Sequence, residues 1–329
     1  MNSKRRVVIV GGGKMGGDIA VVFAGGGWSV DVVEPSAATR ARLAERTATA
    51  LRALRSGVRS ARSVRAHESI ESVPWAGANL VVETVPEILA LKREVLADVS
   101  RLAPRDAIVT TNSSSLRLAE VMTHVAHKSR TAGVHWLTPA HIAPLVEVVR
   151  GPKTSDATIR RVNAWLSELG KLAINLNRDV PGMLVNRVQH AMMREAFNLL
   201  DGGIVSAEDI DAAVRFGFGF RYVACGPVRQ RDLNGLTIHL QSAAQIYPTL
   251  HNGPDAPRCL AKRVRDGHVG VQAGKGFYEW NPRTRARAIA RIDALMREAL
   301  SLMETDLGTE KQAARKRAAA RGTDRSRKG

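Results

Sequence analysis

The chain has 329 residues, of which 49 are basic and 31 acidic, so its formal net charge at neutral pH is +18. Hydrophobic residues make up 44% and charged residues 24%, as in an ordinary globular protein with room for about two domains. It has no apolar run of the roughly 18 residues that span a membrane, and two cysteines make neither a disulfide framework nor a metal site. We therefore expect a cytoplasmic protein without a membrane segment or a bound metal.

Short runs rich in β-branched residues alternate with helical stretches through the first half of the chain. The runs predicted as buried strands are 7–10, 30–33, 80–82, 108–110, 131–135 and 146–149, and 172–176 could add one more. Segments rich in Arg, Ala and Leu lie between them and are predicted as helices, such as 40–56 and 88–101. Hydrophobic strands that alternate with helices indicate a parallel sheet covered by helices on both faces.

A glycine-rich turn, with Gly11, Gly13 and Gly16, follows the first strand and opens a helix. In this spacing the first glycine allows a tight turn, the second lets a pyrophosphate approach the backbone, and the third lets helix and strand pack closely. Glu34 ends the second strand, where an acid accepts hydrogen bonds from the ribose hydroxyls of NAD and repels the 2′-phosphate of NADP. The pattern predicts NAD binding. The alternative is a structural turn with a surface glutamate.

His135 ends the strand 131–135, at the edge where open α/β sheets bind their ligands. Glu147 lies inside the next apolar strand, and it needs a partner because burying an unpaired carboxylate is costly. A histidine from the adjacent strand would be that partner, and the pair would hold the imidazole in one tautomer and favour its protonated form. The pattern predicts a general acid and base. The alternatives are a structural histidine, and a Glu147 that pairs with an arginine.

Polar residues follow the strand 108–110 at the same edge of the sheet, in the run Thr111-Asn112-Ser113-Ser114-Ser115. Their hydroxyls could bind a substrate oxygen. Serine is also a preferred helix cap, so the residues alone leave both interpretations open.

The pattern changes after residues 179–182. Apolar residues recur at helical spacing over 186–200, on so broad an arc that this helix is predicted to be buried. Further helices are predicted over 206–216, 236–246 and 283–303. We expect an α/β domain over 1–180, a helical domain over 181–303 and a basic, disordered tail over 304–329.

Most of the excess positive charge lies in two stretches. Eight arginines stand against one acid over 40–65, and eight basic residues stand against two acids over 309–329. The first is predicted to be the solvated face of a helix and the second a disordered tail. Neither contains an aromatic residue on which nucleotide bases could stack, so nucleic-acid binding is disfavoured. A basic rim that attracts phosphate-bearing ligands fits better.

Taken together, these residues resemble the 3-hydroxyacyl-CoA dehydrogenase superfamily over about residues 5–280. The matching pieces occur in the family's order: the glycine turn with its Lys14-Met15-Gly16, then 82–87, 111–116, 135–139, 145–149, 181–187 and 274–278. The resemblance implies a Rossmann-type, doubly wound, mostly parallel sheet domain, followed by an all-α domain for dimerisation and substrate binding. It also implies an NAD cofactor, a small hydroxyacyl or ketoacyl substrate, and a homodimer.

The resemblance further implies roles for single residues. His135 would be the acid and base, Glu147 would orient it, and Ser114 and Asn186 would contact the oxygen of the reacting carbon. Contacts with NAD are implied for Gly11, Gly13, Lys14, Met15, Gly16, Glu34, Glu87, Lys92 and Asn112.

Within the superfamily, the sequence after residue 203 is closer to the λ-crystallin/L-gulonate dehydrogenase branch and to a branch that oxidises a pyridine-carboxylate. Those relatives act on free acids, so Arg221 is a candidate for gripping a substrate carboxylate, with an ordinary surface or interface charge as the alternative. Thr138 and Asp18 depart from the family's asparagine and glycine. A segment after Glu34 that is shorter than in the fatty-acid-oxidising members argues against long acyl-CoA substrates.

We therefore expect an NAD-dependent dehydrogenase that interconverts a 3-hydroxy and a 3-keto group on a 3-hydroxyacyl-CoA or a small free hydroxy acid. His135 would take the hydroxyl proton as hydride passes to the nicotinamide. The alternatives are a biosynthetic ketoreductase for a polyketide or carrier-bound acyl group, and a non-catalytic, crystallin-like NAD-binding protein.

Overall fold

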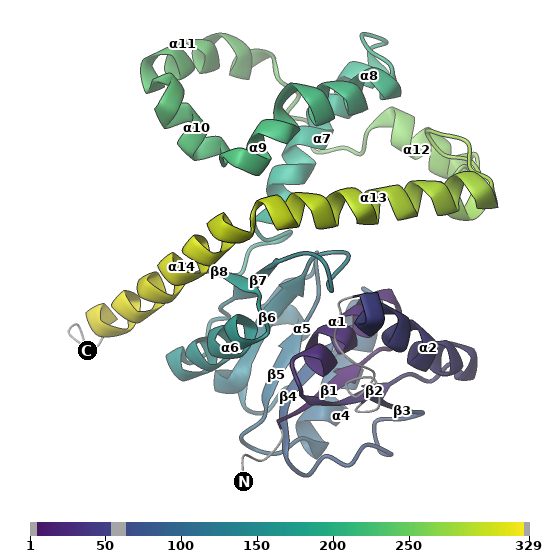
Figure 1. Cartoon of the computed structure of the whole chain (residues 1–329), viewed down its shortest axis with the longest axis vertical. Helices are drawn as coiled ribbons and strands as arrows, with labels where there is room; N and C mark the ends of the chain where they lie inside the picture. The colour runs from purple at the N-terminus through teal and green to yellow at the C-terminus, as the bar shows by residue number, and fades with distance from the viewer. Residues whose placement is uncertain (1–4, 54–63, 326–329) are drawn as a thin grey trace. The chain divides into compact units, whose positions relative to one another are not determined.

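The computed structural model of the chain describes residues 5–53 and 64–325. The chain divides into two compact units, of which the first comprises Met1–Asn186 with Asp306–Gly329 and the second Arg187–Thr305. All eight strands belong to the first unit, and the second is helical (Figure 1).

One sheet organises the first unit, with the strand order β3-β2-β1-β4-β5-β6-β7-β8. Its strands are β1 (Arg6–Val10), β2 (Ser29–Val33), β3 (Val64–His67), β4 (Ala78–Glu83), β5 (Ile108–Thr111), β6 (Thr131–Trp136), β7 (Leu145–Val149) and β8 (Leu172–Leu176). Every neighbouring pair is parallel except β6 with β7. The predicted doubly wound, mostly parallel sheet is confirmed. Its order reverses between β1 and β4, and such sheets bind ligands outside the carboxyl ends of the strands at that point.

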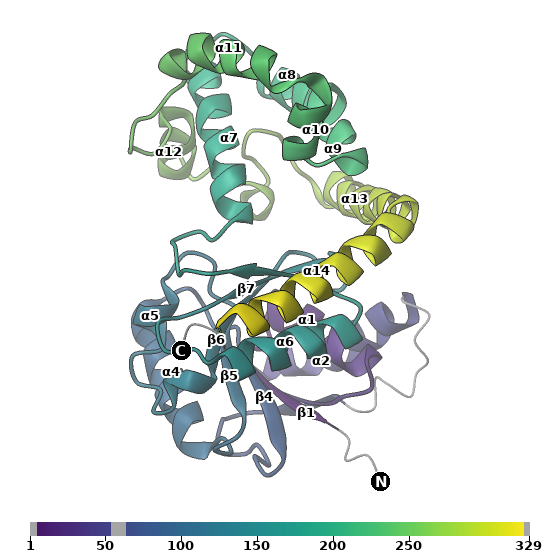
Figure 2. The same cartoon turned by 90° about the vertical axis from the view of Figure 1, so that its left-hand side faces the viewer.

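Helices cover both faces of the sheet (Figures 1 and 2). On one face, the strands pack against α1 (Lys14–Gly25), α2 (Ala37–Ala53) and α6 (Asp156–Glu168), and on the other against α4 (Leu89–Leu102) and α5 (Leu118–Val121). Val7 and Ile9 of β1 belong to the first core, whereas Val8 and Val10 belong to the second. Because successive side chains of a strand point to opposite faces, a strand buried on both sides is an unbroken apolar run. A short 3-10 turn, η1 (Lys128–Arg130), precedes β6.

The second unit contains helices and turns, with two isolated β-bridges that join Lys275 to Gly270 and to Glu279. In chain order it holds most of α7 (Val185–Asp201), then α8 (Ala207–Ala212), a π-helical stretch η2 (Ala213–Gly219), α9 (Phe220–Ala224), α10 (Pro227–Asn234), α11 (Leu236–Ile246), η3 (Tyr247–Thr249), α12 (Arg258–Arg265), η4 (Val271–Ala273) and α13 (Pro282–Leu302). Among its residues, all of which the structure describes, Ala196 alone is buried in a single copy of the chain. The helix predicted over 186–200 is present, but it is not buried within one copy.

Strand β3 was not predicted, because its first two residues fall in the stretch 40–65 that was interpreted as a solvated helix face. Helix α2 ends at Ala53, and residues 54–63 of that stretch lie outside the described residues. Arg65 of β3 donates from Nε to Oδ1 of Asp31 at 2.9 Å, and His67 lies 2.8 Å from the same oxygen. Asp31 is fully buried in β2. The guanidinium of Arg65 therefore neutralises a buried carboxylate, and β3 lacks the apolar pattern by which a strand is predicted from a sequence.

The end of the chain also differs from the disordered tail predicted over 304–329. Helix α14 (Glu304–Arg325) occupies most of it, and residues 326–329 lie outside the described part of the chain. Alanine, lysine, arginine and glutamate are strong helix formers, so the composition that indicated a solvated tail also favours a helix. None of the described helices is both long and apolar enough to cross a membrane.

Candidate active site

The glycine turn after β1 leaves an open surface at the switch point of the sheet. Gly11 adopts a φ of +109°, which residues with side chains rarely adopt. A Cβ at Gly16 would lie 1.8 Å from the carbonyl oxygen of Gly11, so only glycine lets α1 begin this close to β1. A Cβ at Gly13 would have no atom within 4 Å. Gly11 and Gly16 are thus packed against protein atoms, whereas Gly13 faces open space. A pyrophosphate can therefore approach the backbone at Gly13.

Glu34 is fixed beside this turn, at the end of β2. Its Oε2 accepts from the N–H of Gly12 and its Oε1 from that of Ser36, both at 2.9 Å. Arg40 donates to the carbonyl oxygens of Glu34 and Pro35, both at 2.7 Å. Backbone oxygens therefore hold Arg40. The carboxylate of Glu34 is oriented beside the glycine turn, which is the place from which an acid binds the ribose hydroxyls of NAD.

The two departures from the family pattern both lie where α1 meets the segment after β6. Thr138 donates from Oγ1 to Sδ of Met15 at 3.0 Å. Asp18, 9% exposed, has Oδ1 at 3.4 Å from Nδ1 of His141 and 4.0 Å from Nη2 of Arg46. The negative charge that Asp18 brings to the first helix therefore has the guanidinium of Arg46 near it, whereas Oδ2 of Asp18 has no hydrogen-bond partner among the described residues. The sequence predicted the charge but not its partners, which come from distant segments.

Lys92, implied as a cofactor contact by the resemblance, is buried at 1% exposure between two carboxylates. Its Nζ lies 2.8 Å from Oε1 of Glu83 and 3.3 Å from Oε2 of Glu87, and it donates to the carbonyl of Val85 at 3.0 Å. Burial raises the pKa of Glu83, although Lys92 and the hydroxyl of Thr111 oppose the shift. The ammonium is thus occupied by protein acceptors, and this geometry makes Lys92 a support for Glu87.

Glu87 binds the loop over residues 112–116 that follows β5, here called the serine loop. Its Oε1 accepts from Oγ of Ser113 at 2.6 Å and from the N–H groups of Ser114 and Ser115 at 3.0 and 2.8 Å. Burial acts to raise the pKa of Glu87, but these hydrogen bonds and the charge of Lys92 outweigh it and lower the pKa to about 2. The Ser114 hydroxyl makes no hydrogen bond to a described residue. The hydroxyls of Ser113 and Ser115 are therefore both held by Glu87, whereas the hydroxyl of Ser114 has no partner among the described residues.

His135 and Glu147 face each other across the antiparallel pair of the sheet. The register places them directly opposite, with 2.7 Å between Nδ1 of His135 and Oε2 of Glu147. The histidine is 5% exposed and the glutamate fully buried. Asn112 ties the serine loop to this strand, since its Oδ1 accepts from the N–H of Trp136 at 2.8 Å. Because the carboxylate engages Nδ1, Nε2 is the ring nitrogen that can exchange a proton with a ligand.

The second carboxylate oxygen of Glu147 binds the start of α7. Its Oε1 accepts from the N–H groups of Leu184 and Val185, at 2.8 and 3.0 Å. Met183, just before them, has a φ of +53°, which is uncommon for a residue with a side chain. Burial acts to raise the pKa of Glu147, but the hydrogen bonds from His135, Val185 and Leu184 outweigh it and lower the pKa. The carboxylate is therefore ionised. The sequence predicted the pair with histidine but carried no sign of the two backbone donors.

Two further predicted residues lie on helices. Asn186 directly follows Val185 on the first turn of α7 and is half-buried. Arg221 lies exposed on α9 of the second unit, so its role stays a prediction. Within 5–53 and 64–325 there is no group of three or more His, Cys, Asp or Glu side chains that could hold a metal.

The arrangement combines three chemical capacities at the carboxyl edge of one sheet. An open glycine turn with an oriented carboxylate can bind a dinucleotide. A serine hydroxyl that has no partner among the described residues can donate to a ligand oxygen. An imidazole held by an ionised, buried carboxylate can take a proton from an alcohol and return it to a ketone.

Both the first and the second part of the chain are similar to known proteins. Residues 6–180 match the family model for the 3-hydroxyacyl-CoA dehydrogenase NAD binding domain, and residues 182–280 match that for the C-terminal domain. The 5-formyl-3-hydroxy-2-methylpyridine 4-carboxylate 5-dehydrogenase of Mesorhizobium japonicum is 32% identical over 298 residues, covering 89% of this chain and 96% of that protein. A crystal structure of a 5-dehydrogenase for the same compound, described as an NAD⁺-dependent dismutase, superposes with a TM-score of 0.83 at 29% identity, covering 92% and 98% of the two chains.

Two other relatives are named for a CoA substrate and for a lens protein. A probable 3-hydroxybutyryl-CoA dehydrogenase of Bacillus subtilis is 30% identical and covers 85% of this chain and 99% of its own. The λ-crystallin of Oryctolagus cuniculus is 31% identical, with 69% and 74% covered. Both family models match in order across most of the sequence, and the glycine turn has the shape that NAD requires. The chain therefore belongs to the 3-hydroxyacyl-CoA dehydrogenase family of NAD-dependent oxidoreductases.

Proposed function

We propose that this enzyme interconverts a secondary alcohol and a ketone, β to a carboxyl or thioester carbonyl, on a small free hydroxy acid or a 3-hydroxyacyl-CoA. The observation that carries the proposal is the His135–Glu147 pair, buried and 2.7 Å apart. A purely structural, crystallin-like protein would need neither an imidazole held by an ionised carboxylate nor a serine hydroxyl that no described residue engages.

In this proposal His135 is the acid and base. Its Nε2 removes the hydroxyl proton during oxidation and returns it during reduction, while NAD, when bound, accepts or supplies the hydride. Glu147 is a positioning residue, because it keeps Nδ1 protonated and stabilises the imidazolium that oxidation produces. Ser114 and Asn186 donate to the reacting oxygen, where negative charge develops during ketone reduction.

The cofactor is held by groups that the geometry has already oriented. Gly13 receives the pyrophosphate at the start of α1, since it faces open space. Glu34 accepts from the ribose hydroxyls and disfavours the 2′-phosphate of NADP. The remaining residues of the cofactor proposal shape the turn or support the serine loop: Gly11, Lys14, Met15, Gly16, Glu87, Lys92 and Asn112.

A free carboxylate substrate is the first candidate. The carboxylate 5-dehydrogenase from Mesorhizobium is similar over nearly its whole length, and the solved structure of such an enzyme superposes at a TM-score of 0.83. Arg221 would then grip the carboxylate through paired N–H donors. A 3-hydroxyacyl-CoA is the second candidate, favoured by the family's own name and by the Bacillus relative.

A substrate panel tests the proposal. 3-Hydroxybutyrate, 3-hydroxybutyryl-CoA, L-gulonate and a pyridine alcohol carrying a carboxylate are each offered with NAD and with NADP, and formation of the reduced cofactor is followed by absorbance. We expect NAD-dependent turnover of at least one of them, reduced about 10²–10⁴-fold in His135→Gln. The exposed His124 gives a matched control, because His124→Gln should be unaffected. Turnover that survives His135→Gln would contradict the proposal.

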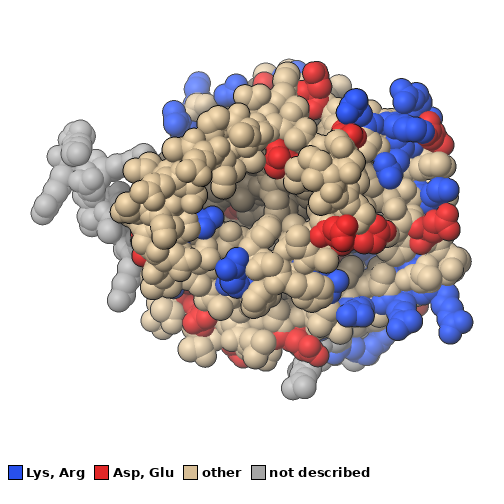
Figure 3. Space-filling model, turned by 90° about the horizontal axis from the view of Figure 1, so that it is seen from above, with Lys and Arg blue, Asp and Glu red and all other residues tan. Residues whose placement is uncertain are grey.

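We also propose that the second unit forms a homodimer. Its large apolar side chains are exposed: Val228, Leu233 and Leu240 are 77%, 75% and 73% exposed, and only Ala196 is buried. Figure 3, which looks onto this unit, shows a mostly uncharged face with acidic and basic side chains mixed around it. Exposed apolar area of this extent marks an interface, and obligate dimer interfaces resemble a domain core cut in half. A second copy supplies a matching apolar surface by symmetry.

Sedimentation tests the dimer. The full chain should sediment as a dimer at micromolar concentration, and Leu240→Glu should weaken the association by placing a charge in the apolar face. Gln312→Glu adds the same charge at an exposed position on α14 of the first unit and provides a comparison for the effect of added charge alone. A monomer at micromolar concentration would contradict this proposal without affecting the proposed chemistry.

A further inference from the structure

Helix α13 has an apolar side that a single copy of the chain leaves exposed. Ile289, Ile292 and Met296 recur at intervals of three and four residues, so they lie on one side of the helix. Ile289 and Ile292 are 50% and 55% exposed, and Leu295 beside them is 46% exposed. The hydrophobic effect favours covering this side, which the described residues of one copy do not do. The family model for the C-terminal domain ends at residue 280, so α13 lies outside it.

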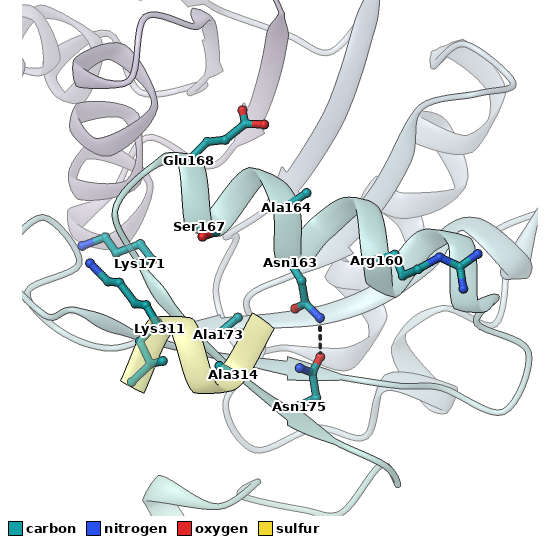
Figure 4. Close-up of a pocket in the computed structure, with 11 residues that line it drawn as sticks. Arg160, Asn163, Ala164, Ser167, Glu168, Lys171, Ala173, Asn175, Lys311 and Ala314 are labelled. Atoms are coloured by element: carbon teal, nitrogen blue, oxygen red, sulfur yellow. Dashed lines mark hydrogen bonds between the residues drawn. The ribbon is translucent and has the colours of Figure 1, made fainter. Parts of the chain in front are cut away.

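Both ends of α13 are tied to other parts of the chain. Asn281 caps its first turn, since Oδ1 of Asn281 accepts from the N–H of Thr284 at 2.9 Å. After α13, the chain continues into α14, where Ala314 lines one pocket of the first unit together with Ala164 of α6 and Ala173 of β8 (Figure 4). The apolar side of α13 therefore belongs to a helix that is held before and after it, and not to a free end of the chain.

The second unit also has a pocket of about 420 Å³ with a mostly apolar lining, here called the α7–α12 pocket. It lies between α7, α8, α12 and residues within 268–280. Phe197 of α7 and Phe277 stack in it, with 5.4 Å between the ring centroids. Val264 and Val269 also line the pocket, and they are 58% and 56% exposed. The pocket can therefore take apolar side chains, and burying them would also cover its own.

The charges beside the α7–α12 pocket and those of α13 are opposite in sign. Helix α8, which contributes Asp211 to the lining, has three acidic residues and no basic one. The first half of α13, over 282–292, has four arginines and no acid. Arg285 precedes Ile289 by four residues, so it lies in line with the apolar side. Asp211 accepts from the hydroxyl of Tyr278 at 2.7 Å, and neither it nor Arg285 forms an ion pair with a described residue.

We infer that the apolar side of α13 of one copy occupies the α7–α12 pocket of a second copy. Ile292 packs against the partner's Val264, and Arg285 lies beside the partner's Asp211. A twofold axis repeats the contact, so each copy inserts its own helix and receives that of its partner. The inference rests on the proposed homodimer, for which it specifies a contact, and it is independent of the proposed chemistry.

Cross-linking between two differently tagged full-length chains tests the inference. Cys225→Ser and Cys259→Ser remove the native thiols from both chains. One chain then carries Ile292→Cys and the other Val264→Cys, and the coexpressed pair is treated with a short bismaleimide. We expect a cross-linked product that carries both tags. In the matched control, Arg287→Cys replaces Ile292→Cys, and it should give little of this product because Arg287 lies on the polar side of α13.

Sedimentation equilibrium gives a second measurement without cysteines. Arg285→Glu should weaken the dimer by about tenfold or more, because it replaces an attraction to the partner's Asp211 by a repulsion. Arg287→Glu makes the same change of charge on the polar side of the helix and should leave the dissociation constant nearly unchanged.

The possible outcomes separate this inference from the proposed dimer. A dimer that yields no product with both tags would overturn the inference and leave the dimer standing. Equal products from Ile292→Cys and Arg287→Cys would overturn it as well. So would a product in which two Ile292→Cys chains are joined in preference to Val264→Cys, because that would show α13 packing against its own copy in the partner. A monomer would refute both the dimer and this contact.

Discussion

Replacing Glu147 by glutamine tests how the histidine is oriented. The carboxylate accepts three hydrogen bonds, from Nδ1 of His135 at 2.7 Å and from the N–H groups of Leu184 and Val185 at 2.8 and 3.0 Å. An amide has one oxygen and one nitrogen. If its oxygen accepts from the two backbone donors, its nitrogen faces the imidazole and donates to Nδ1. The ring proton then moves to Nε2, which can no longer accept the proton of the substrate.

The size of the effect follows from this change of tautomer. A positioned general base contributes about 10²–10⁴-fold, so Glu147→Gln should lower kcat for oxidation by that factor, or about 2.7–5.4 kcal/mol of activation free energy. Stability should change less, by about 1–2 kcal/mol, because the amide still occupies the same volume and keeps the backbone hydrogen bonds. Binding of NADH should be unchanged, since Glu147 is remote in sequence and contact from the glycine turn.

Steady-state kinetics of the single and double variants decide the matter. Glu147→Gln and His135→Gln should each lose most of the rate, and the double variant should lose little more than His135→Gln, since residues that act as a unit are strongly non-additive. Fluorescence titration with NADH and thermal unfolding check that binding and fold persist. If Glu147→Gln keeps more than a third of the oxidation rate, the tautomer argument fails. Additive losses in the double variant would show that the two residues act separately.

Three further outcomes are expected. Gly13→Ala should fold normally, because its Cβ would meet no atom within 4 Å, but it should weaken NADH binding at least tenfold. Gly16→Ala should instead destabilise the fold, because its Cβ would lie 1.8 Å from a carbonyl oxygen. Thermal unfolding and NADH titration of both variants check these two expectations. NADH should bind at least tenfold more tightly than NADPH, about 1.4 kcal/mol, because Glu34 is fixed toward the ribose, and equal affinities by fluorescence titration would refute this. Burial lowers the pKa of Lys171 from 10.5 to about 8, so between pH 8 and 10.5 the unfolded chain binds more protons than the folded chain. The free energy of unfolding should therefore rise with pH over this range, by up to about 3 kcal/mol. Urea unfolding of Lys171→Met should lack that rise, and equal slopes in the two proteins would contradict the assignment.

The acid and base pair of the site could be predicted from the sequence, because it depends on the pattern of apolar residues along a strand. Glu147 interrupts an apolar strand, and a buried acid must find a partner on an adjacent strand, which led to His135. The glycine turn and Glu34 could be predicted for a similar reason, because their spacing is tied to one local strand–turn–helix unit.

What could not be predicted depends on contacts between distant segments. The donors that Leu184 and Val185 offer to Glu147 are backbone groups, and backbone donors leave no mark on residue type. Arg65 was interpreted as a solvated charge because its partner, Asp31, belongs to a strand 34 residues earlier. The two carboxylates that surround Lys92 inside the protein could not be predicted either, because Lys92 reaches them only in the folded chain.

The antiparallel register of β6 and β7 has a consequence for how the segment between these strands can change in length. His135 and Glu147 are opposed because the ladder between the strands fixes them, and the connection over 137–144 does not set their separation. Insertions or deletions in that connection should therefore leave the dyad assembled, provided that the strands still pair. One extra residue inside either strand would turn every following side chain to the opposite face and send the carboxylate or the imidazole into the other core. Length variation among related sequences should accordingly gather in the connection and be absent from the two strands, a pattern that an alignment of natural variants can check.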